Sequence, residues 1–320
     1  MALPDFFLVG AAKAGTTALH AALSTHPQLS FAAIKEPKYF LCGDRPPAPH
    51  LQRGPGDAHS AQEWVWRRDD YERLFAHAPP GTLRGESTPF YLYDRASHRR
   101  LVAAVPHARL IAVVRDPVDR AHSNWMHLWS DGLEPEPDFL AALAAEDERV
   151  AAGWAPFWHY RRQGRYGEQL SHLLGLVPRE QLLLLRYRDL VDEPVRTLDR
   201  VCAFLGVRPT PLGGVPRENV RPYVVPGTVR DRFTRPLLRA GFRAGAWAPP
   251  QWWRAASAPL LALRHRGGVA RPRLSALERR EVLRPLLPDI ALLEQVTGES
   301  FADWRAETSA EPTVGAAREG

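Results

Sequence analysis

The stretch that most constrains this chain is FFLVGAAKAGTTAL, residues 6–19, close to the N-terminus. A short apolar run that ends at Gly10 predicts a buried strand, and residues 16–23 predict a helix with two leucines on one face. The tight turn between them would aim unpaired backbone N–H groups and the positive end of the helix dipole at one point. We therefore expect an anion, and by our interpretation a phosphate, to bind between Gly10 and Thr17.

This loop departs from the two best-known nucleotide-binding sequences. The ATP- and GTP-binding loop requires G-x-x-x-x-G-K-[ST]; Gly10 and Gly15 have that separation, but Thr16 stands where the lysine belongs. The lysine, Lys13, lies inside the loop instead, and the G-x-G-x-x-G dinucleotide fingerprint is absent. An ordinary strand-to-helix turn with an incidental lysine is one alternative. A P-loop-like kinase is another, which the displaced lysine and the missing strand-terminal aspartate for Mg²⁺ argue against.

Composition favours an anionic ligand. The formal net charge is +6 and the sequence pI is about 9.6. Only three of the 42 basic residues are lysines, and Lys13, Lys35 and Lys38 all lie beside the proposed loop. A compact ammonium can approach a bridging oxygen where the broad fork of arginine would not serve. Chance clustering is the alternative reading.

Several partners and compartments are not expected. The chain has no recognised nucleic-acid-binding motif, and Cys42 and Cys202 are too few for a disulfide framework or a metal site. We expect no metal and no nucleic acid. Because we find neither a signal stretch nor an apolar run of about 20 residues, we expect a soluble, cytoplasmic protein. The oligomeric state cannot be read from the sequence.

Apolar runs alternate with helical patterns along the first two thirds of the chain. The predicted strands are residues 6–10, 29–32, 82–87, 109–114 and 181–186, and the predicted helices are 16–23, 71–77, 94–105, 117–129, 138–150, 166–176 and 195–205. This alternation predicts a three-layer α/β fold with a central parallel sheet that is covered on both faces. Ligands of such sheets bind beyond the carboxyl ends of the strands, where the loop, Glu86 to Thr88, and Arg115-Asp116 would converge.

The last third of the chain is less regular. Residues 217–234 are polar and loop-like, residues 242–266 predict helices separated by prolines, and residues 274–296 predict an amphipathic, proline-interrupted helix. We expect one domain over residues 1–306, with an Arg/Trp-rich helical insertion at about 235–270 and a disordered tail at 307–320. The insertion could cover an acceptor site or contact a membrane surface.

Three motifs share their order and spacing with a known family. The first is the Gly10–Thr17 loop with its lysine in the middle. The second is the 109–114 strand, followed by Arg115-Asp116-Pro117 and by a serine eight residues after that arginine. The third runs from Tyr187 through an acidic residue, a leucine and a proline to Phe-Leu-Gly at 204–206. Together they resemble the sulfotransferases that use 3′-phosphoadenosine 5′-phosphosulfate (PAPS), closest in style to bacterial and glycan-type enzymes.

The resemblance covers about residues 5–210, and it implies a P-loop-NTPase-like phosphosulfate-binding loop, PAPS as donor and its desulfated form (PAP) as product, without a metal. The implied donor-binding residues are Lys13, Ala14, Gly15, Thr16, Thr17, Ala18, Arg115, Ser123 and Tyr187. Arg115 and Ser123 would hold the 3′-phosphate, and Tyr187 would contact adenine. Two anion sites on adjacent strand ends suit a nucleotide that is phosphorylated at both ends.

The chemistry that the resemblance implies is in-line transfer of a sulfuryl group to a hydroxyl rather than an amine, with Lys13 stabilising charge on the bridging oxygen. In the glycan enzymes a glutamate before two aromatic residues deprotonates the acceptor, and Glu36 in Lys-Glu-Pro-Lys-Tyr-Phe matches it. Glu86 in Gly-Glu-Ser-Thr-Pro is the alternative base. Those enzymes carry a lysine where Ser87 stands, and Lys35 or Lys38 could supply that charge.

The acceptor stays open among a glycan, a glycolipid and a small secondary metabolite. Two other functions also stay open: a P-loop-like kinase, and a non-catalytic protein that binds a nucleotide or a membrane surface.

Overall fold

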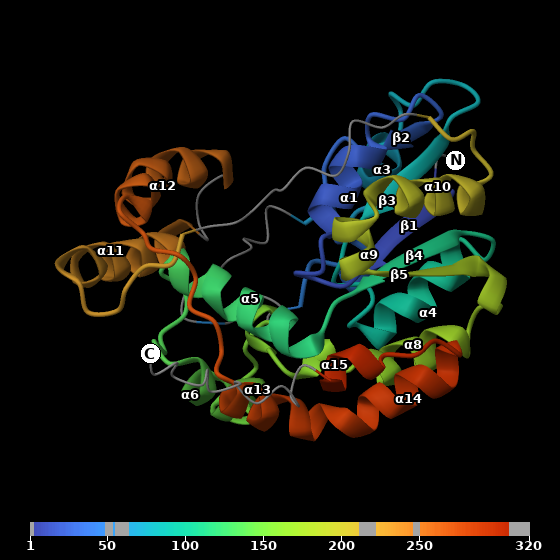
Figure 1. Cartoon of the computed structure of the whole chain (residues 1–320). Coiled ribbons are helices and arrows are strands. Elements are labelled where there is room, and N and C mark those ends of the chain that lie inside the picture. Colours follow the sequence, from blue (N-terminus) through green and yellow to red (C-terminus); the bar gives the residue numbers. More distant parts are fainter. Residues whose placement is uncertain (1–2, 49–53, 55–63, 211–221, 246–249, 307–320) are drawn as a thin grey trace, which may run out of the picture.

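The computed structural model describes residues 3–48, 54, 64–210, 222–245 and 250–306 (Figure 1). Its centre is a five-stranded sheet of order β2-β3-β1-β4-β5, in which every pair of neighbours is parallel. The strands are β1 (Phe6–Gly10), β2 (Leu29–Phe31), β3 (Leu83–Ser87), β4 (Arg109–Val114) and β5 (Leu182–Arg186). The predicted parallel sheet is therefore confirmed.

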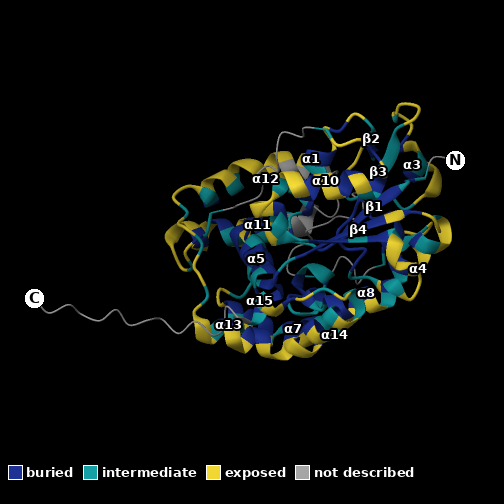
Figure 2. Ribbon diagram, turned by 45° about the vertical axis from the view of Figure 1, so that its right-hand side comes forward, coloured by how far each residue is buried: buried dark blue, intermediate teal, exposed yellow. Residues whose placement is uncertain are grey.

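Helices cover both faces of this sheet. Figures 1 and 2 show α1 and α10 on one face and α4 and α8 on the other. The helices are α1 (Thr16–Leu23), α2 (Tyr39–Cys42), α3 (Arg68–Arg73), α4 (Arg95–Ala104), α5 (Pro117–Ser130), α6 (Phe139–Ala144), α7 (Glu146–Ala151), α8 (Tyr166–Leu174), α9 (Tyr187–Asp192), α10 (Pro194–Leu205), α11 (Val229–Gly245), α12 (Pro250–His265), α13 (Ala276–Leu283), α14 (Leu287–Thr297) and α15 (Ala302–Ala306). The three predicted layers are thus present.

The central strands are apolar along their whole length because both of their faces are covered. All of β1 and residues 110–114 of β4 are buried, as the dark-blue strands in Figure 2 show. Gly85 of β3 pairs with Phe6 of β1, and a side chain at Gly85 would collide with the Phe6 ring. That ring packs edge-on against Phe31 of β2 with centroids 5.3 Å apart. A glycine in the middle of β3 therefore makes room for an aromatic layer beneath the sheet.

The strand order fixes where a ligand can bind. The chain leaves β1 for β2 and β3 on one side, and then crosses to β4 and β5 on the other. The carboxyl end of β1 is therefore the topological switch point, where open parallel sheets form their binding crevice. The loop after β1 and the start of α5 after β4 both lie at this point.

The C-terminal helices pack against this core. Asp289 of α14 accepts hydrogen bonds of 2.9 Å from the backbone N–H groups of Gly167 and Glu168, at the start of α8. Arg279 of α13 donates to Asp116 and, at 2.7 Å, to Asp119 at the start of α5. The single domain over residues 1–306 stays a prediction, and the predicted tail at 307–320 lies outside the described residues.

Four predicted segments differ from the structure. The helix predicted at 71–77 is α3, which lies at Arg68–Arg73. The helix predicted at 138–150 is two helices, α6 and α7, and the break precedes Glu146, whose buried carboxylate accepts from the backbone N–H groups of Arg161 and Arg162 at 3.1 and 3.0 Å. Residues 229–234, predicted as loop, begin α11. Pro259, in the segment predicted as helices separated by prolines, lies inside α12 instead of ending it.

Candidate active site

The loop between β1 and α1 leads into a helix whose positive end has no compensating side chain of its own. Gly15 caps α1 in the left-handed conformation, with φ 89°, and offers no side-chain cap. The first turn of α1 holds no acidic residue either, so nothing on the helix itself compensates its positive end. Ala14 and Thr16 are buried at this turn, whereas Lys13, Thr17 and Ala18 are partly exposed. The N–H groups at the start of α1 and the ammonium of Lys13 thus belong to one short loop.

Backbone strain concentrates at this end of the sheet. Lys13, Glu36 and Lys38 have φ angles of 68°, 60° and 62°, and within the described part of the chain they are the non-glycine residues with positive φ. Such a conformation costs about 1–3 kcal/mol and persists where the surrounding structure imposes it, often at ligand-binding positions. Two of the three are predicted site residues, and the third was a candidate for the missing positive charge.

Arg115 forms a second cationic position directly beside the loop. Its Nη1 donates to the carbonyl oxygen of Lys13 at 3.3 Å, and its Cζ lies 4.6 Å from the centre of the Tyr187 ring. A side chain at Gly15 would come within 2.9 Å of that ring. The Nε of Arg115 is buried and has no hydrogen-bond partner among the described residues. The structure therefore brings Lys13, Gly15, Arg115 and Tyr187 together, with a donor left over for a ligand.

Ser123 lies two turns into α5, on a helix that starts as the sequence predicts. Asp116 caps α5 by accepting from the N–H groups of Val118 and Asp119 at 2.9 and 3.1 Å. Burial, and then the charge of Asp119, raise the pKa of Asp116 to about 6, against the lowering effect of Arg279. Ser123 itself is buried. It stays a prediction that this serine binds the donor.

Arg120 is a site residue that the sequence analysis missed. Its guanidinium is fully buried, donates to the carbonyl oxygen of Tyr160, and approaches the carbonyl oxygen of Ala12 in the loop at 3.5 Å. Burial lowers its pKa. No local signal marks it, because α5 carries several other polar side chains, among them Asp119 and His122. Arg120 ties the donor loop to the segment after α7.

Glu36 lies at the carboxyl end of β3. Its backbone N–H donates to the carbonyl oxygen of Ser87 at 3.0 Å, and Lys35 Nζ donates to its Oε1 at 2.6 Å. The hydroxyl of Ser87 is 2.9 Å from Nδ1 of His20 on α1. Burial and then Lys35 lower the pKa of His20 to about 4, while Glu36 raises it. Glu36 is therefore part of the same cluster as α1, and it is partly exposed.

Glu86, the alternative base, lies in the interior. Its Oε2 accepts from the hydroxyls of Tyr71 at 2.6 Å and Tyr91 at 3.0 Å, and its side chain has no solvent exposure. The hydroxyl of Tyr91 also accepts from the N–H of Phe40 in α2 at 3.2 Å. Burial raises the pKa of Glu86 to about 7, against its hydrogen bonds, which lower it. Glu86 thus links β3, α3 and α2 behind Glu36.

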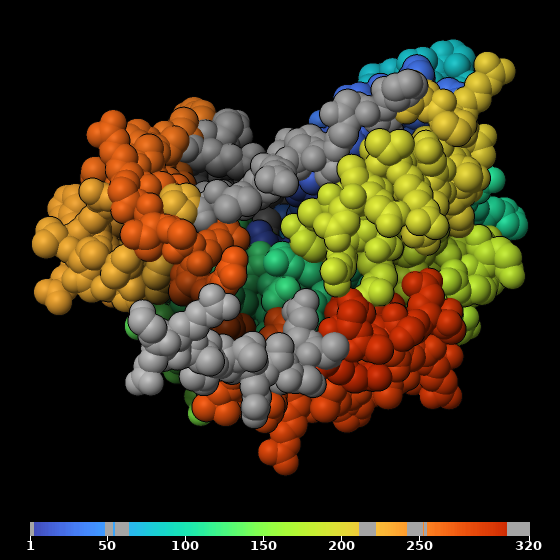
Figure 3. Space-filling view, viewed as in Figure 1, coloured from blue at the N-terminus to red at the C-terminus, as the bar shows by residue number. Residues whose placement is uncertain are grey.

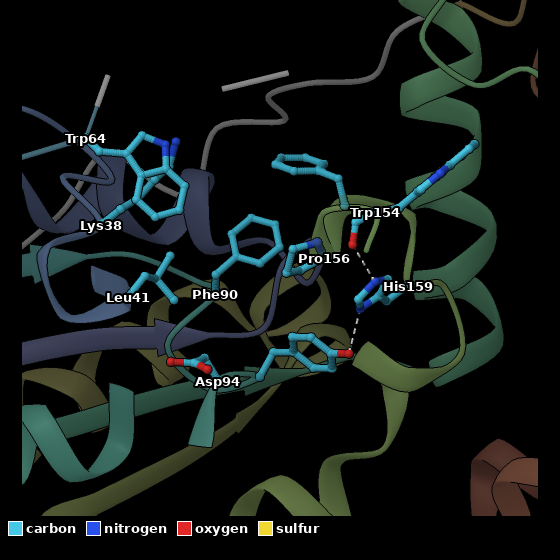
Figure 4. A pocket seen from close by; sticks show the side chains of 10 residues that line it. Lys38, Leu41, Trp64, Phe90, Asp94, Trp154, Pro156 and His159 are labelled. Carbon is cyan, nitrogen blue, oxygen red and sulfur yellow. Dashed lines mark hydrogen bonds between the residues drawn. The ribbon is translucent and has the colours of Figure 1, made fainter. Parts of the chain in front are cut away.

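A cavity of about 190 Å³ adjoins this cluster (Figure 4). Most of its wall is aromatic, and Lys38 and Asp94 are its charged members; the lining residues are Lys38, Leu41, Trp64, Phe90, Tyr93, Asp94, Trp154, Pro156, Phe157 and His159. Lys38 Nζ lies 5.3 Å from the centre of the Trp64 ring, which is a cation–π distance. Lys35 and Lys38 therefore have different places, one against Glu36 and the other in the cavity wall.

Internal hydrogen bonds satisfy much of the polar surface of this cavity. His159 Nε2 is 3.0 Å from the carbonyl oxygen of Trp154 and therefore carries the proton that it donates. The neutral Nδ1 then accepts from the Tyr93 hydroxyl at 2.8 Å, and both bonds are drawn in Figure 4. Asp94 accepts from the N–H of Ser97 at 2.7 Å as the cap of α4. The wall that remains for a ligand is mainly ring surface.

Hydrogen bonds attach both sides of the cavity to elements next to the Lys13 loop, namely β1 and α5. On one side, the N–H of Leu92 donates to the carbonyl oxygen of Val9 at 2.8 Å, which holds the Phe90 segment against β1. On the other, Asn124 Nδ2 of α5 donates to the carbonyl oxygen of Phe157 at 2.6 Å. The cavity is therefore fixed next to the Lys13 loop, although its residues are far apart in the sequence.

The structure thus combines a parallel α/β sheet, a strand-loop-helix turn at its switch point, an arginine at the next strand end and an aromatic cavity alongside. The chain belongs to the sulfotransferase family that uses PAPS: a family model described as "Sulfotransferase family" matches residues 4–211.

Relatives and a solved structure agree with this. Human heparan sulfate glucosamine 3-O-sulfotransferase 3B1 is 30% identical over 207 residues, which are 64% of this chain and 47% of that protein. The human 3-O-sulfotransferase 6 is 32% identical over 205 residues, which are 64% of this chain and 53% of that protein. This chain thus spans about half the length of these curated relatives. A crystal structure of a sulfotransferase from Alicyclobacillus acidocaldarius has a TM-score of 0.72 at 28% identity, covering 95% of this chain and all of that one.

Two features are absent from the residues that the structure describes. In that part of the chain no helix is long and apolar enough to cross a membrane. It also holds no group of three or more His, Cys, Asp or Glu residues that could bind a metal ion.

Proposed function

We propose that this protein is a sulfotransferase that moves a sulfuryl group from PAPS to a hydroxyl of an acceptor, such as a glycan, a glycolipid or a secondary metabolite. The observation that carries the proposal is the contact of the Lys13 loop with Arg115 and Tyr187. This contact supports the proposal because Arg115 donates to the loop that carries Lys13, directly before the N-terminus of α1. A bisphosphorylated nucleotide needs both cations.

The residues present fit the donor. PAPS supplies an activated sulfuryl group on its 5′-phosphate. The N–H groups of residues 14–18 and the hydroxyls of Thr16 and Thr17 would hold that phosphate, and Lys13 would neutralise charge on its bridging oxygen. The unpartnered Nε of Arg115 would donate to the 3′-phosphate, with Ser123 alongside, and Tyr187 would cover the adenine.

Glu36 is the base that we propose. It is partly exposed at the strand ends, whereas Glu86 has no exposure and two tyrosine hydroxyls already donate to it. A general base must come within hydrogen-bond reach of the acceptor hydroxyl. Glu86 would instead have a positioning role: its tyrosine partners would hold α2, and with it the segment that carries Glu36.

Titration calorimetry with PAP tests the donor site, with ATP and magnesium as the competing ligand. We expect PAP to bind, and Arg115→Ala to weaken it at least about tenfold, because a charge-assisted pair to a phosphate is lost. The matched control is Arg196→Ala, an exposed arginine of α10 that pairs with Glu193. Binding of ATP without any response to PAP would refute the proposal and favour a kinase.

Substitutions in the wall of the cavity test whether the acceptor binds there. A pocket of this size holds about one substituted ring, since an engineered apolar cavity of about 150 Å³ accepts benzene. We expect Phe90→Ala or Trp154→Ala to raise KM for ring-bearing alcohols several-fold and to leave PAP affinity unchanged. Leu277→Ala, at an exposed position of α13, is the control. Unchanged KM values would place the acceptor elsewhere.

A further inference from the structure

The α11–α12 hairpin exposes an unusual amount of apolar surface. Seven of the thirteen large hydrophobic side chains exposed in the described chain lie between residues 225 and 269: Val225, Val229, Phe233, Leu237, Trp252, Leu263 and Val269. The proposed function uses none of them. Figure 1 shows the hairpin beyond one end of α5, at a distance from the sheet.

On α11 these side chains form a stripe. Val229, Phe233 and Leu237 follow one another at intervals of four residues, so they share one face of the helix, and their exposures are 86%, 60% and 47%. The opposite face is the packed one: Asp231, Thr234 and Leu238 have no exposure. The apolar stripe therefore points to solvent while polar side chains are buried.

On α12 the outward face has the same character. The exposed side chains that the structure describes between 252 and 263 are all uncharged: Trp252, Ala255, Ala256, Ala258, Pro259, Ala262 and Leu263. A solvated helix ordinarily carries charged and polar residues on this face. Two neighbouring helices thus present apolar faces that no described residue of this chain covers.

The charge around these faces has one sign. Residues 222–273 contain ten arginines and a single acidic residue, Asp231. Asp231 is fully buried and pairs with Arg264 at 2.9 Å, so it contributes no negative charge at the surface. Arg230, Arg232 and Arg266 are exposed beside the apolar residues. Residues 222–273 thus combine exposed arginine with valine, phenylalanine, leucine and tryptophan, and their one carboxylate is buried.

We infer that the α11–α12 hairpin docks on the surface of a membrane that contains anionic lipids. Interfacial helices combine an apolar face, which enters the headgroup boundary, with flanking arginines that bind lipid phosphates. Tryptophan is enriched at that boundary. A polyanionic glycan or a nucleic acid would account for the arginines, but not for the apolar stripe.

The hairpin is firmly attached to the helix that starts at the donor site. Arg264 Nε and Nη2 donate to the carbonyl oxygens of Ser130 and Trp129 at 2.8 and 2.9 Å, at the last turn of α5. Trp129 Nε1 donates to the carbonyl oxygen of Val224 at 2.7 Å. Figure 3 shows the orange hairpin raised beside a hollow with green atoms of the α5 region at its base. A docked hairpin would therefore hold the catalytic crevice in a fixed orientation to the bilayer.

Co-sedimentation of the full chain with vesicles tests this inference. We expect binding to phosphatidylcholine vesicles that contain phosphatidylglycerol, weaker binding at high salt, and little binding to phosphatidylcholine alone. The double variant Phe233→Asp/Trp252→Asp should reduce the bound fraction about tenfold. Val195→Asp, at an exposed apolar position of α10, is the matched control and should bind as the wild type does.

Two further measurements make the outcome decisive. PAP titration of each variant shows that the fold and the donor site are intact, because the substituted side chains point to solvent. Binding to heparin then separates an anionic membrane from a polyanionic glycan as the partner. We expect the Phe233→Asp/Trp252→Asp variant to lose vesicle binding by a larger factor than heparin binding. Failure of the wild type to sediment with anionic vesicles would overturn the inference. So would a double variant that binds vesicles normally, since arginine alone would then suffice.

Discussion

Lys13 combines two properties that a single substitution can separate. Its ammonium lies in the donor loop, and its backbone has φ 68°. Asparagine tolerates this conformation, whereas most other residues are strained there. Lys13→Asn therefore removes the charge and keeps the loop.

We expect Lys13→Asn to lower kcat at least about 100-fold, because it removes charge stabilisation from the leaving oxygen. The temperature of unfolding should stay unchanged or rise. Lys13→Arg should not restore activity, because a broad planar fork replaces a compact charge. Steady-state kinetics and thermal unfolding on the same preparations check this. A Lys13→Asn enzyme with a normal kcat would remove Lys13 from the mechanism.

Glu86 gives a prediction on pH. Burial raises its pKa from 4.5 to about 7, so the native state holds the proton more tightly than the unfolded chain does. Between these two values the native state binds more protons, and stability must fall as pH rises; above about 7 this contribution is level.

Glu86→Gln cannot titrate, and its amide oxygen can still accept from Tyr71 and Tyr91. We expect the free energy of unfolding of the wild type to fall relative to Glu86→Gln by up to about 3 kcal/mol between about pH 5 and 8. Denaturant titrations at several pH values measure this difference. Parallel pH profiles for the two proteins would show that Glu86 stays ionised in the fold.

At the scale of the element, the strand-loop-helix unit depends on Gly15. Its φ is 89°, and a side chain there would meet the Tyr187 ring. Gly81 has a similar φ of 83° but nothing within 4 Å of an added Cβ. A comparison of the two glycines therefore separates the cost of a left-handed backbone from the cost of the contact with the Tyr187 ring.

We expect Gly81→Ala to cost about 1 kcal/mol, the cost of a left-handed alanine alone. Gly15→Ala should cost at least that much and also weaken PAP binding about tenfold or more, because Tyr187 and the helix N-terminus must move apart. Equal losses of stability with unchanged PAP affinity in both variants would mean that the packing of Tyr187 on the loop is unimportant for the donor.

Elements with a strong local signal could be predicted from the sequence. β4 has its predicted bounds because an apolar run buried on both faces ends at Arg115, and α5 starts where Asp116-Pro117 places it. Tyr187 directly follows β5 and begins α9. The candidate donor-binding residues could be proposed from the sequence because each of their motifs is a contiguous stretch of the chain.

The remaining features depend on contacts between distant segments. The aromatic cavity combines residues 38–41, 64, 90–94 and 154–159, and no local pattern marks them as neighbours. Arg120 reads as an ordinary helix residue until its partners at Ala12 and Tyr160 are known. The polar residues of 229–234 suggested a loop. They form a helix instead, because Asp231 and Thr234 are buried as hydrogen-bond partners of Arg264 on another helix. Tertiary pairing overrides local polarity in this segment.

At the scale of the whole molecule, the hairpin and the sheet domain are joined through Arg264. Its side chain has no exposure, pairs with Asp231, and donates to two carbonyl oxygens at the end of α5. A basic group at that end also suits the negative pole of the helix. Burial lowers the pKa of Arg264, while Asp231 raises it.

Arg264→Ala would leave Asp231 buried without its nearest cation, and it would remove one of the hydrogen-bond donors to each of two carbonyl oxygens at the end of α5. We expect a loss of about 3–5 kcal/mol in the free energy of unfolding, the usual cost of breaking a buried pair on one side. Arg266→Ala, two residues on and exposed, should change it by less than about 0.5 kcal/mol. If the hairpin comes loose as a unit, PAP binding should survive in Arg264→Ala while the proteolytic sensitivity of residues 222–273 rises. Simultaneous loss of PAP binding would mean instead that α5 transmits the damage to Arg115, so that hairpin and donor site form one cooperative unit.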